Sequence, residues 1–187
     1  MDKGTENYRR FLTGDENGLE EIVKEYKDGL ILYLNSFIKN IHISEELMED
    51  TFVKLVIKKP KLDENRAFKT WLYKVARNLA IDYLRKNSRM KKSDVSDEEL
   101  TAIVADKEDL EQNYIRKEEK ILLHKSISNL SENYRQVLYL SYFENFSNKE
   151  TAEIMKKNKR QVENLIYRAK LSLKAELEKE GFTYEGL

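Results

Sequence analysis

The stretch FKTWLYKVARNLAIDYLRK, residues 68–86, repeats apolar side chains three and four positions apart, which is the spacing of one face of an α-helix. At about 100° per residue, these side chains form a single stripe that a helical core would bury. The residues of this expected core face are Phe68, Leu72, Val75, Ala76, Leu79 and Tyr83. The stretch therefore predicts a core helix that runs to about residue 89.

A second stripe follows one edge of the same predicted helix and contains Trp71, Lys74, Asn78, Arg85 and Arg89. These residue types suit a single-stranded nucleic acid. Bases stack on an aromatic ring, an amide bonds an exposed base edge, and cations neutralise phosphates. A lone tryptophan is also explained as an ordinary core residue, and Trp71 can serve both purposes.

The composition of the whole chain favours helices. Its 187 residues include one proline, six glycines and no cysteine, so helix breakers are rare and disulfide or thiolate chemistry is excluded. No apolar run has the length of a signal peptide or a membrane span, so we expect a cytoplasmic protein. We predict an all-α fold.

Charge is distributed in blocks although the formal net charge is zero. Residues 68–92 carry eight cations and one anion, residues 94–119 carry ten anions and three cations, and residues 156–170 carry six cations and one anion. A single charge run is usually a solvated helix face, but two basic blocks indicate contact with a polyanion. We expect two small helical domains, residues 1–92 and 116–187, joined by a flexible acidic linker at residues 93–115.

Helical spacing also predicts helices over residues 19–41 and 45–59, with Ser44 as the N-cap of the second and Pro60 after its end. On the second helix Val53 and Ile57 fall among acidic residues, on the face opposite its core stripe. Although isolated surface apolar residues are common, apolar side chains on an acidic face indicate a docking site for another protein. The residues of this face are Glu46, Glu49, Asp50, Val53 and Ile57.

The C-terminal part predicts a helix-turn-helix. Apolar stripes near residues 118–130 and 132–146 indicate two helices, with core residues including Ile121, Leu122, Ile127, Val137, Leu138 and Tyr142. Ser147 with Glu150 forms a capping box that begins a short helix, and Asn158 with Gln161 begins a longer one. In such a motif the second helix enters the major groove by its N-terminal end. Its outward side chains, suited to base edges and phosphates, are Lys159, Arg160, Gln161, Asn164, Tyr167 and Arg168.

Three segments together resemble the extracytoplasmic-function sigma factors of bacterial RNA polymerase, within the sigma-70 family. Residues 67–86 are similar to the family's promoter-melting segment, and residues 44–52, SEELMEDTF, to its polymerase-gripping helix. KETAEI at 149–154 followed by QVENLIYRAK at 161–170 resembles its second DNA-reading domain. The resemblance covers residues 19–178 in the family's order and spacing.

The resemblance implies a protein that binds core RNA polymerase and directs promoter recognition and melting, with an anti-sigma factor as inhibitory partner. It assigns contact with the minus-ten element to Asn65, Arg66, Trp71, Lys74, Arg77, Asn78, Arg85 and Arg89. The outward face of the last helix would read the minus-thirty-five element as duplex, and the acidic face with Val53 and Ile57 would dock on the clamp helices of the polymerase. The acidic linker would thread the polymerase.

Two residues depart from the family pattern. Glu49 stands where the family usually has glutamine, which adds charge to the polymerase contact. Glu163 stands in the recognition helix where many members carry a cation; a carboxylate there could accept a hydrogen bond from cytosine or repel phosphate.

No catalytic, metal-binding or cofactor-binding pattern competes with this reading. His42 and His124 are isolated from further ligands at metal spacing, and the chain has no glycine-rich phosphate loop or nucleophile motif. Two alternatives remain: a stand-alone helix-turn-helix regulator of duplex DNA, and a helical adaptor with solvated basic faces. A regulator that binds only duplex DNA would not need the Trp71 stripe or the exposed Val53 and Ile57.

Overall fold

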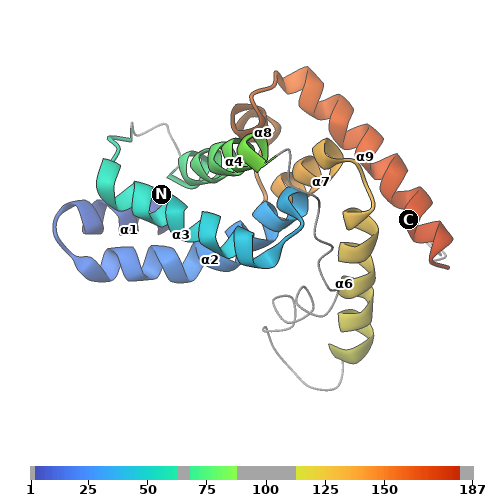
Figure 1. The fold of residues 1–187 in the computed structure, drawn as a ribbon, viewed down its shortest axis with the longest axis horizontal. Helices are drawn as coiled ribbons and strands as arrows, with labels where there is room; N and C mark the ends of the chain where they lie inside the picture. The colour runs from blue at the N-terminus through green and yellow to red at the C-terminus, as the bar shows by residue number, and fades with distance from the viewer. Residues whose placement is uncertain (1–2, 63–67, 88–112, 182–187) are drawn as a thin grey trace.

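The computed structural model describes residues 3–62, 68–87 and 113–181. The described residues of the N-terminal half form α1 (Lys3–Leu12), α2 (Glu16–Ile38), α3 (Ile41–Lys58) and α4 (Phe68–Asn87). The C-terminal half contains α6 (Asn113–Ser128), α7 (Glu132–Leu138), the π-helical turn η1 (Tyr139–Phe143), α8 (Asn148–Met155) and α9 (Lys159–Lys179). The prediction of an all-α fold is confirmed, and the described residues contain no strand (Figure 1).

The N-terminal half is built around α2, on which α1, α3 and α4 pack. Helix α1 was not expected from the sequence. It is held by Tyr8, whose ring stacks on Phe68 at a centroid distance of 5.0 Å and whose hydroxyl donates a hydrogen bond to the carbonyl oxygen of Pro60 at 2.8 Å. This contact joins the first helix to both ends of the segment between α3 and α4.

Local capping sets the boundaries of α3. The side chain of Asn40 accepts a hydrogen bond from the backbone N–H of Ile43, so the helix begins one turn earlier than expected. The assignment of Ser44 as the N-cap was wrong: Ser44 is buried within the helix, and its hydroxyl donates to the carbonyl of Asn40. The end was predicted well, since Lys59 closes the helix in the left-handed conformation just before Pro60.

Both predicted capping boxes of the C-terminal half are confirmed, at Ser147 with Glu150 and at Asn158 with Gln161. They fix where α8 and α9 begin and thereby orient the helix-turn-helix. Tyr142 was predicted to lie in the core, but it is 48% exposed. The chain makes a π-helical turn at this point, with the N–H of Glu144 donating to the carbonyl of Tyr139, and the extra residue rotates Tyr142 off the buried face.

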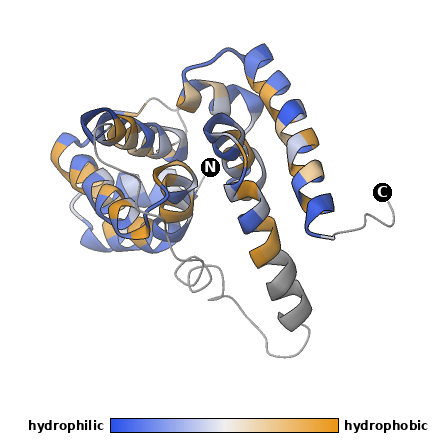
Figure 2. Ribbon diagram, turned by 45° about the vertical axis from the view of Figure 1, so that its right-hand side comes forward, coloured by the Kyte–Doolittle hydropathy of each residue, from blue (hydrophilic) through white to orange (hydrophobic). Residues whose placement is uncertain are grey.

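The two halves pack directly against each other. Helix α8 lies beside α4, and α7 lies against the end of α2 (Figure 1). The buried apolar residues of both halves belong to one core cluster. In Figure 2, hydrophobic and hydrophilic residues alternate along the helices of both halves. Of the predicted linker, residues 93–112 lie outside the described residues, and α6 begins at Asn113, within the last three residues of the predicted range.

No helix in the described ranges is both long enough and apolar enough to cross a membrane.

Candidate nucleic-acid interface

Helix α4 positions the predicted single-strand stripe by burying the face beside it. Phe68, Leu72 and Ala76 are fully buried, which confirms the centre of the expected core face. Trp71 is half-buried and packs against the core cluster from its edge. Part of the Trp71 side chain therefore remains exposed, and the residue also packs against the core.

The rest of the stripe becomes more exposed toward the end of α4. Lys74 and Asn78 are half-buried, and Arg85 is exposed and lies 3.2 Å from Asp82. Asn65, Arg66 and Arg89 lie outside the described residues. Arg77 differs from the others because it is buried, with 8% of its surface exposed.

Helix α9 presents all six of its predicted DNA-reading side chains to solvent. They are Lys159, Arg160, Gln161, Asn164, Tyr167 and Arg168. Burial of Val162 and Ala169 on the opposite side fixes the rotation of the helix. The amide oxygen of Gln161 already accepts a hydrogen bond from the N–H of Asn158 at 2.9 Å, so this side chain contributes to capping as well as to the exposed face.

Helix α3 carries the predicted docking face. Val53 and Ile57 are 52% and 75% exposed, and Glu46, Glu49 and Asp50 are exposed around them. Sequence analysis missed Val56, which is 39% exposed and extends the apolar part of the face. Of its neighbours in the sequence, Leu55 is fully buried and Ile57 is the most exposed apolar residue of α3. Val56 therefore lies between the buried and the exposed side of the helix.

Both halves of the chain match family models of known proteins. Residues 22–90 match the Sigma-70 region 2 family model, and residues 120–173 match Sigma-70 region 4. The chain is 31% identical over 157 residues to the ECF RNA polymerase sigma factor SigM of Bacillus subtilis (strain 168), covering 84% of this chain and 93% of that protein. The chain belongs to the ECF RNA polymerase sigma factors.

Other similar proteins agree with this assignment. SigW, an ECF sigma factor of the same organism, is 31% identical over 174 residues, covering 88% of this chain and 91% of SigW. Among solved structures, CnrH in complex with the cytosolic domain of CnrY has a TM-score of 0.66 and 19% identity, with 95% of this chain and 99% of that chain covered. RpoE in complex with the anti-sigma factor NepR, from Bartonella quintana, has a TM-score of 0.66 and 18% identity, with 85% and 96% covered.

In this ECF sigma factor, the contacts between the two halves join region 2 to region 4. Lys69 of α4 bonds Glu144 twice: its Nζ lies 2.7 Å from the backbone carbonyl oxygen and 2.9 Å from the carboxylate. The same ammonium group lies 4.9 Å from the ring centroid of Phe146. Sequence periodicity gave no signal for this cluster, because its partners are 75 residues apart and their contact depends on tertiary packing.

Three further pairs cross between the regions of the sigma factor. Their distances are 3.3 Å from the Thr70 hydroxyl to a Glu150 carboxylate oxygen, 3.0 Å from Lys74 Nζ to Glu153, and 2.9 Å from Arg77 Nε to Gln136 Oε1. Arg135 adds a hydrogen bond from its Nε to the carbonyl of Ser36 at the end of α2. Two predicted DNA contacts, Lys74 and Arg77, are therefore engaged by region 4 in this arrangement.

The pKa of the Glu150 carboxyl reflects its position in this sigma factor. Partial burial raises the pKa, but hydrogen bonds from the side chain and backbone of Ser147 and from Thr70, together with the charge of Lys69, outweigh burial and lower it below its ordinary value. Glu150 is thus held as a carboxylate both by the cap of α8 and by two residues of region 2.

The histidines form no metal site in the described part of this sigma factor, where no group of three potential ligands occurs. His42 lies 3.7 Å from Glu45 at the surface. His124 is buried, and its Nδ1 lies 2.5 Å from the hydroxyl oxygen of Tyr139. His124 thus packs within region 4, where its ring also contacts Phe143.

Proposed function

We propose that this sigma factor grips core RNA polymerase through α3, melts the minus-ten element along α4 and reads the minus-thirty-five element with α9. The observation that supports it best is the set of six exposed side chains, of types suited to base edges and phosphates, on the first turns of α9, the second helix of a helix-turn-helix in which both helices begin with a capping box. Arginine pairs with guanine edges, and asparagine or glutamine pairs with adenine. Membership of the sigma factor family indicates that α3, α4 and α9 act while the chain is bound to core RNA polymerase.

Within region 2, the proposed minus-ten residues are Asn65, Arg66, Trp71, Lys74, Arg77, Asn78, Arg85 and Arg89. Trp71 would stack on an unpaired base, since an aromatic ring presented at a basic surface binds any base by its face. The cations along the stripe would neutralise the phosphates of the melted strand. These roles divide the work so that region 2 holds single-stranded DNA and region 4 holds duplex.

In region 4, Glu163 places a carboxylate on α9 beside the proposed DNA contacts. Its carboxylate is 3.7 Å from Lys159 Nζ, one helical turn away. Pairing with Lys159 offsets the repulsion that an isolated carboxylate would exert on phosphate. Glu163 is then free to accept a hydrogen bond from the exocyclic amine of cytosine when Lys159 turns to the backbone.

On α3, the proposed polymerase contacts are Glu46, Glu49, Asp50, Val53 and Ile57. The exposed apolar side chains would supply the buried centre of the interface and the acids its charged rim. Glu49, where the family usually has glutamine, would place an additional negative charge in that rim. Cations on the polymerase clamp helices would complement it.

The partners and setting follow from this role. Solved relatives were captured with a partner described as an anti-sigma factor or as the cytosolic domain of CnrY. We infer that this chain also has an anti-sigma partner and that it works in the cytoplasm, where the polymerase acts. Catalysis would belong to the polymerase, and this chain would contribute recognition without being an enzyme or holding a cofactor.

Run-off transcription tests the proposal. Purified core polymerase is incubated with genomic promoter fragments, with and without this chain. Start sites that appear only with the chain are expected. A chain that binds its promoter tightly without polymerase, and adds no start site with it, would instead indicate a stand-alone regulator.

A further inference from the structure

The beginning of α4 carries Trp71, the only tryptophan of the chain, and packs on α1. We propose that Tyr8 of α1 is a positioning residue for Trp71, which holds the indole where it would meet an unpaired base. The inference rests on the proposed function for the role of Trp71 in promoter opening. The positioning itself rests only on contacts within region 2.

Tyr8 contacts both ends of the segment between α3 and α4. Its side chain is buried, and its hydroxyl donates a hydrogen bond at 2.8 Å to the carbonyl oxygen of Pro60, two residues after the end of α3. Its ring stacks on Phe68, the first residue of α4, with centroids 5.0 Å apart and an interplanar angle of 26°. One side chain therefore holds the start of α4 relative to α3, the helix with the proposed polymerase contacts.

The hydrogen bond between Tyr8 and Pro60 does not depend on pH near neutrality. Burial raises the pKa of Tyr8 to about 12, so the phenol stays protonated and remains a donor. Its acceptor is a backbone carbonyl oxygen, which does not titrate. The contact is therefore a constant structural link between the two helices.

Phe68 transmits this constraint to Trp71. The Phe68 ring is fully buried and contacts Tyr26 of α2 as well as Tyr8, with the Tyr26 ring centroid at 5.7 Å. Trp71 follows three positions later, so the two side chains are neighbours on the helix surface. Trp71 is only half-buried. A partly exposed side chain has fewer packing contacts to hold it, so its direction depends on the helical turn that carries it.

Helix α1 is itself firmly placed, which makes Tyr8 a rigid anchor. A β-carbon at Gly18 of α2 would lie 2.5 Å from the carbonyl oxygen of Asn7 and 2.7 Å from the backbone nitrogen of Phe11, which shows how closely α1 and α2 approach. The ammonium group of Lys59, the C-cap of α3, lies 5.2 Å from the centroid of the Phe11 ring. Helix α1 thus contacts α2 and the end of α3 next to Tyr8.

The first experiment measures the motion of the indole in the full free chain. Because Trp71 is the only tryptophan, red-edge excitation selects it from the tyrosines, and time-resolved fluorescence anisotropy separates its local motion from tumbling. Tyr8→Leu removes both the ring and the hydroxyl and should increase the share of depolarisation caused by local motion. Tyr8→Phe keeps the stacked ring and should retain most of the order. Equal local motion in Tyr8→Leu and the unsubstituted protein would overturn the proposal.

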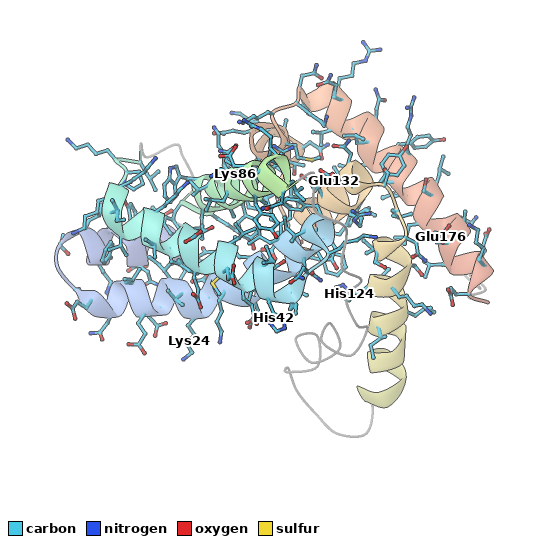
Figure 3. All side chains as sticks on the ribbon, viewed as in Figure 1. Lys24, His42, Lys86, His124, Glu132 and Glu176 are labelled. Carbon is cyan, nitrogen blue, oxygen red and sulfur yellow. The ribbon has the colours of Figure 1, made fainter. Side chains whose placement is uncertain are left out.

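Two controls distinguish positioning from a general loss of stability. Tyr139→Leu makes the same substitution in region 4, where Tyr139 stacks on Phe143 with centroids 4.8 Å apart and an interplanar angle of 27°. It should lower the melting temperature without changing the motion of Trp71. A spin label at Lys86→Cys, at the opposite end of α4 (Figure 3), should not respond to Tyr8→Leu. If Tyr139→Leu mobilises Trp71 as much as Tyr8→Leu, the effect is one of stability and the inference fails.

Circular dichroism establishes that each variant is folded. If Tyr8→Leu is not, Tyr8→Met takes its place, because a longer and more flexible apolar side chain fills more of the vacated volume. The same increase in the motion of Trp71 is expected, since methionine restores neither the stacked ring nor the hydroxyl.

The second experiment tests whether the position of Trp71 matters for opening. In the holoenzyme, Tyr8→Leu should reduce permanganate-reactive open complexes by about three- to tenfold, part of the loss expected when one base stack is removed. Binding to closed duplex should change little. In the Trp71→Ala background, Tyr8→Leu should have almost no further effect, because the two residues act through one indole. Fully additive losses would contradict the inference.

The outcomes separate this inference from the proposed function. If Trp71→Ala leaves opening intact, the proposed role of Trp71 is wrong, and the purpose assigned to Tyr8 is wrong with it. If Trp71→Ala impairs opening but Tyr8→Leu does not, despite greater motion of the indole, the proposed function stands and only this inference fails.

Discussion

The Nε of Arg77 donates a hydrogen bond to Oε1 of Gln136 across the boundary between region 2 and region 4, at a distance of 2.9 Å. Both side chains are buried, and the Gln136 amide nitrogen donates in turn to Glu132 at 2.9 Å. A cation that sequence reasoning assigned to DNA is thus part of an internal polar network. This hydrogen bond therefore contributes to the packing of region 2 against region 4.

Gln136→Ala should lower the free energy of unfolding by about 1 to 3 kcal/mol, because it leaves the buried Arg77 guanidinium without its acceptor. Asn133→Ala, an exposed position on the same helix, should cost less than about 0.5 kcal/mol. Urea unfolding followed by circular dichroism measures both. Equal midpoints for the two variants would mean that the hydrogen bond contributes nothing to stability.

Acid should weaken the contact between α4 and α8. Because the folded-state pKa of Glu150 lies below its ordinary value of 4.5, its contribution is complete above that value and is lost as the pH falls through the folded-state pKa. We expect a loss of no more than about 1 kcal/mol, since the carboxyl is partly exposed.

Glu150→Gln separates titration from capping. Glutamine can still complete the capping box, but it does not ionise. Thermal unfolding is measured between pH 6 and pH 3, about one to two units on either side of the ordinary carboxyl pKa. The melting temperature of Glu150→Gln should fall less steeply over this range than that of the unsubstituted protein. Parallel pH profiles for the two proteins would exclude Glu150 as a source of acid sensitivity.

Trp71→Ala should impair promoter opening while leaving the affinity of the holoenzyme for closed duplex almost unchanged. Stacking on one base contributes about 1 to 3 kcal/mol, so open complexes should form about ten- to a hundredfold less well. Permanganate reactivity of unpaired thymines reports opening, and gel shift at low temperature reports duplex binding. Trp71→Phe keeps an aromatic face and should recover much of the opening; an equal loss of duplex binding would contradict the assignment.

Ile57→Glu should weaken binding to core polymerase by about tenfold or more, as expected for removal of an apolar anchor at the centre of an interface. Its side chain is 75% exposed, so the melting temperature should hardly change. Leu12→Glu is a matched control, because it places the same charge at an exposed apolar residue on α1. Equal polymerase affinities for the two variants, measured by biolayer interferometry, would remove Ile57 from the interface.

Much of the fold was predictable because its signals are local. The 3.6-residue periodicity of α4 and α9 and the capping boxes at Ser147 and Asn158 involve residues within one or two turns. The start of α3 was missed because Asn40 competes with Ser44 as a cap, and both residue types are good caps. The π-helical turn that exposes Tyr142 breaks the periodicity from which its burial was predicted.

The sequence by itself determined the helices other than α1, the N-caps of α8 and α9 and the outward faces of α3 and α9, because each depends on neighbours within a few residues. Only the tertiary structure decided that Lys69, Lys74 and Arg77 face Glu144, Glu153 and Gln136. Those pairs are separated by 59 to 79 residues along the chain. Charge patterns along a sequence cannot distinguish a solvent-exposed cation from one that is paired with another side chain of the protein. Pairing at such separations depends on how whole helices pack.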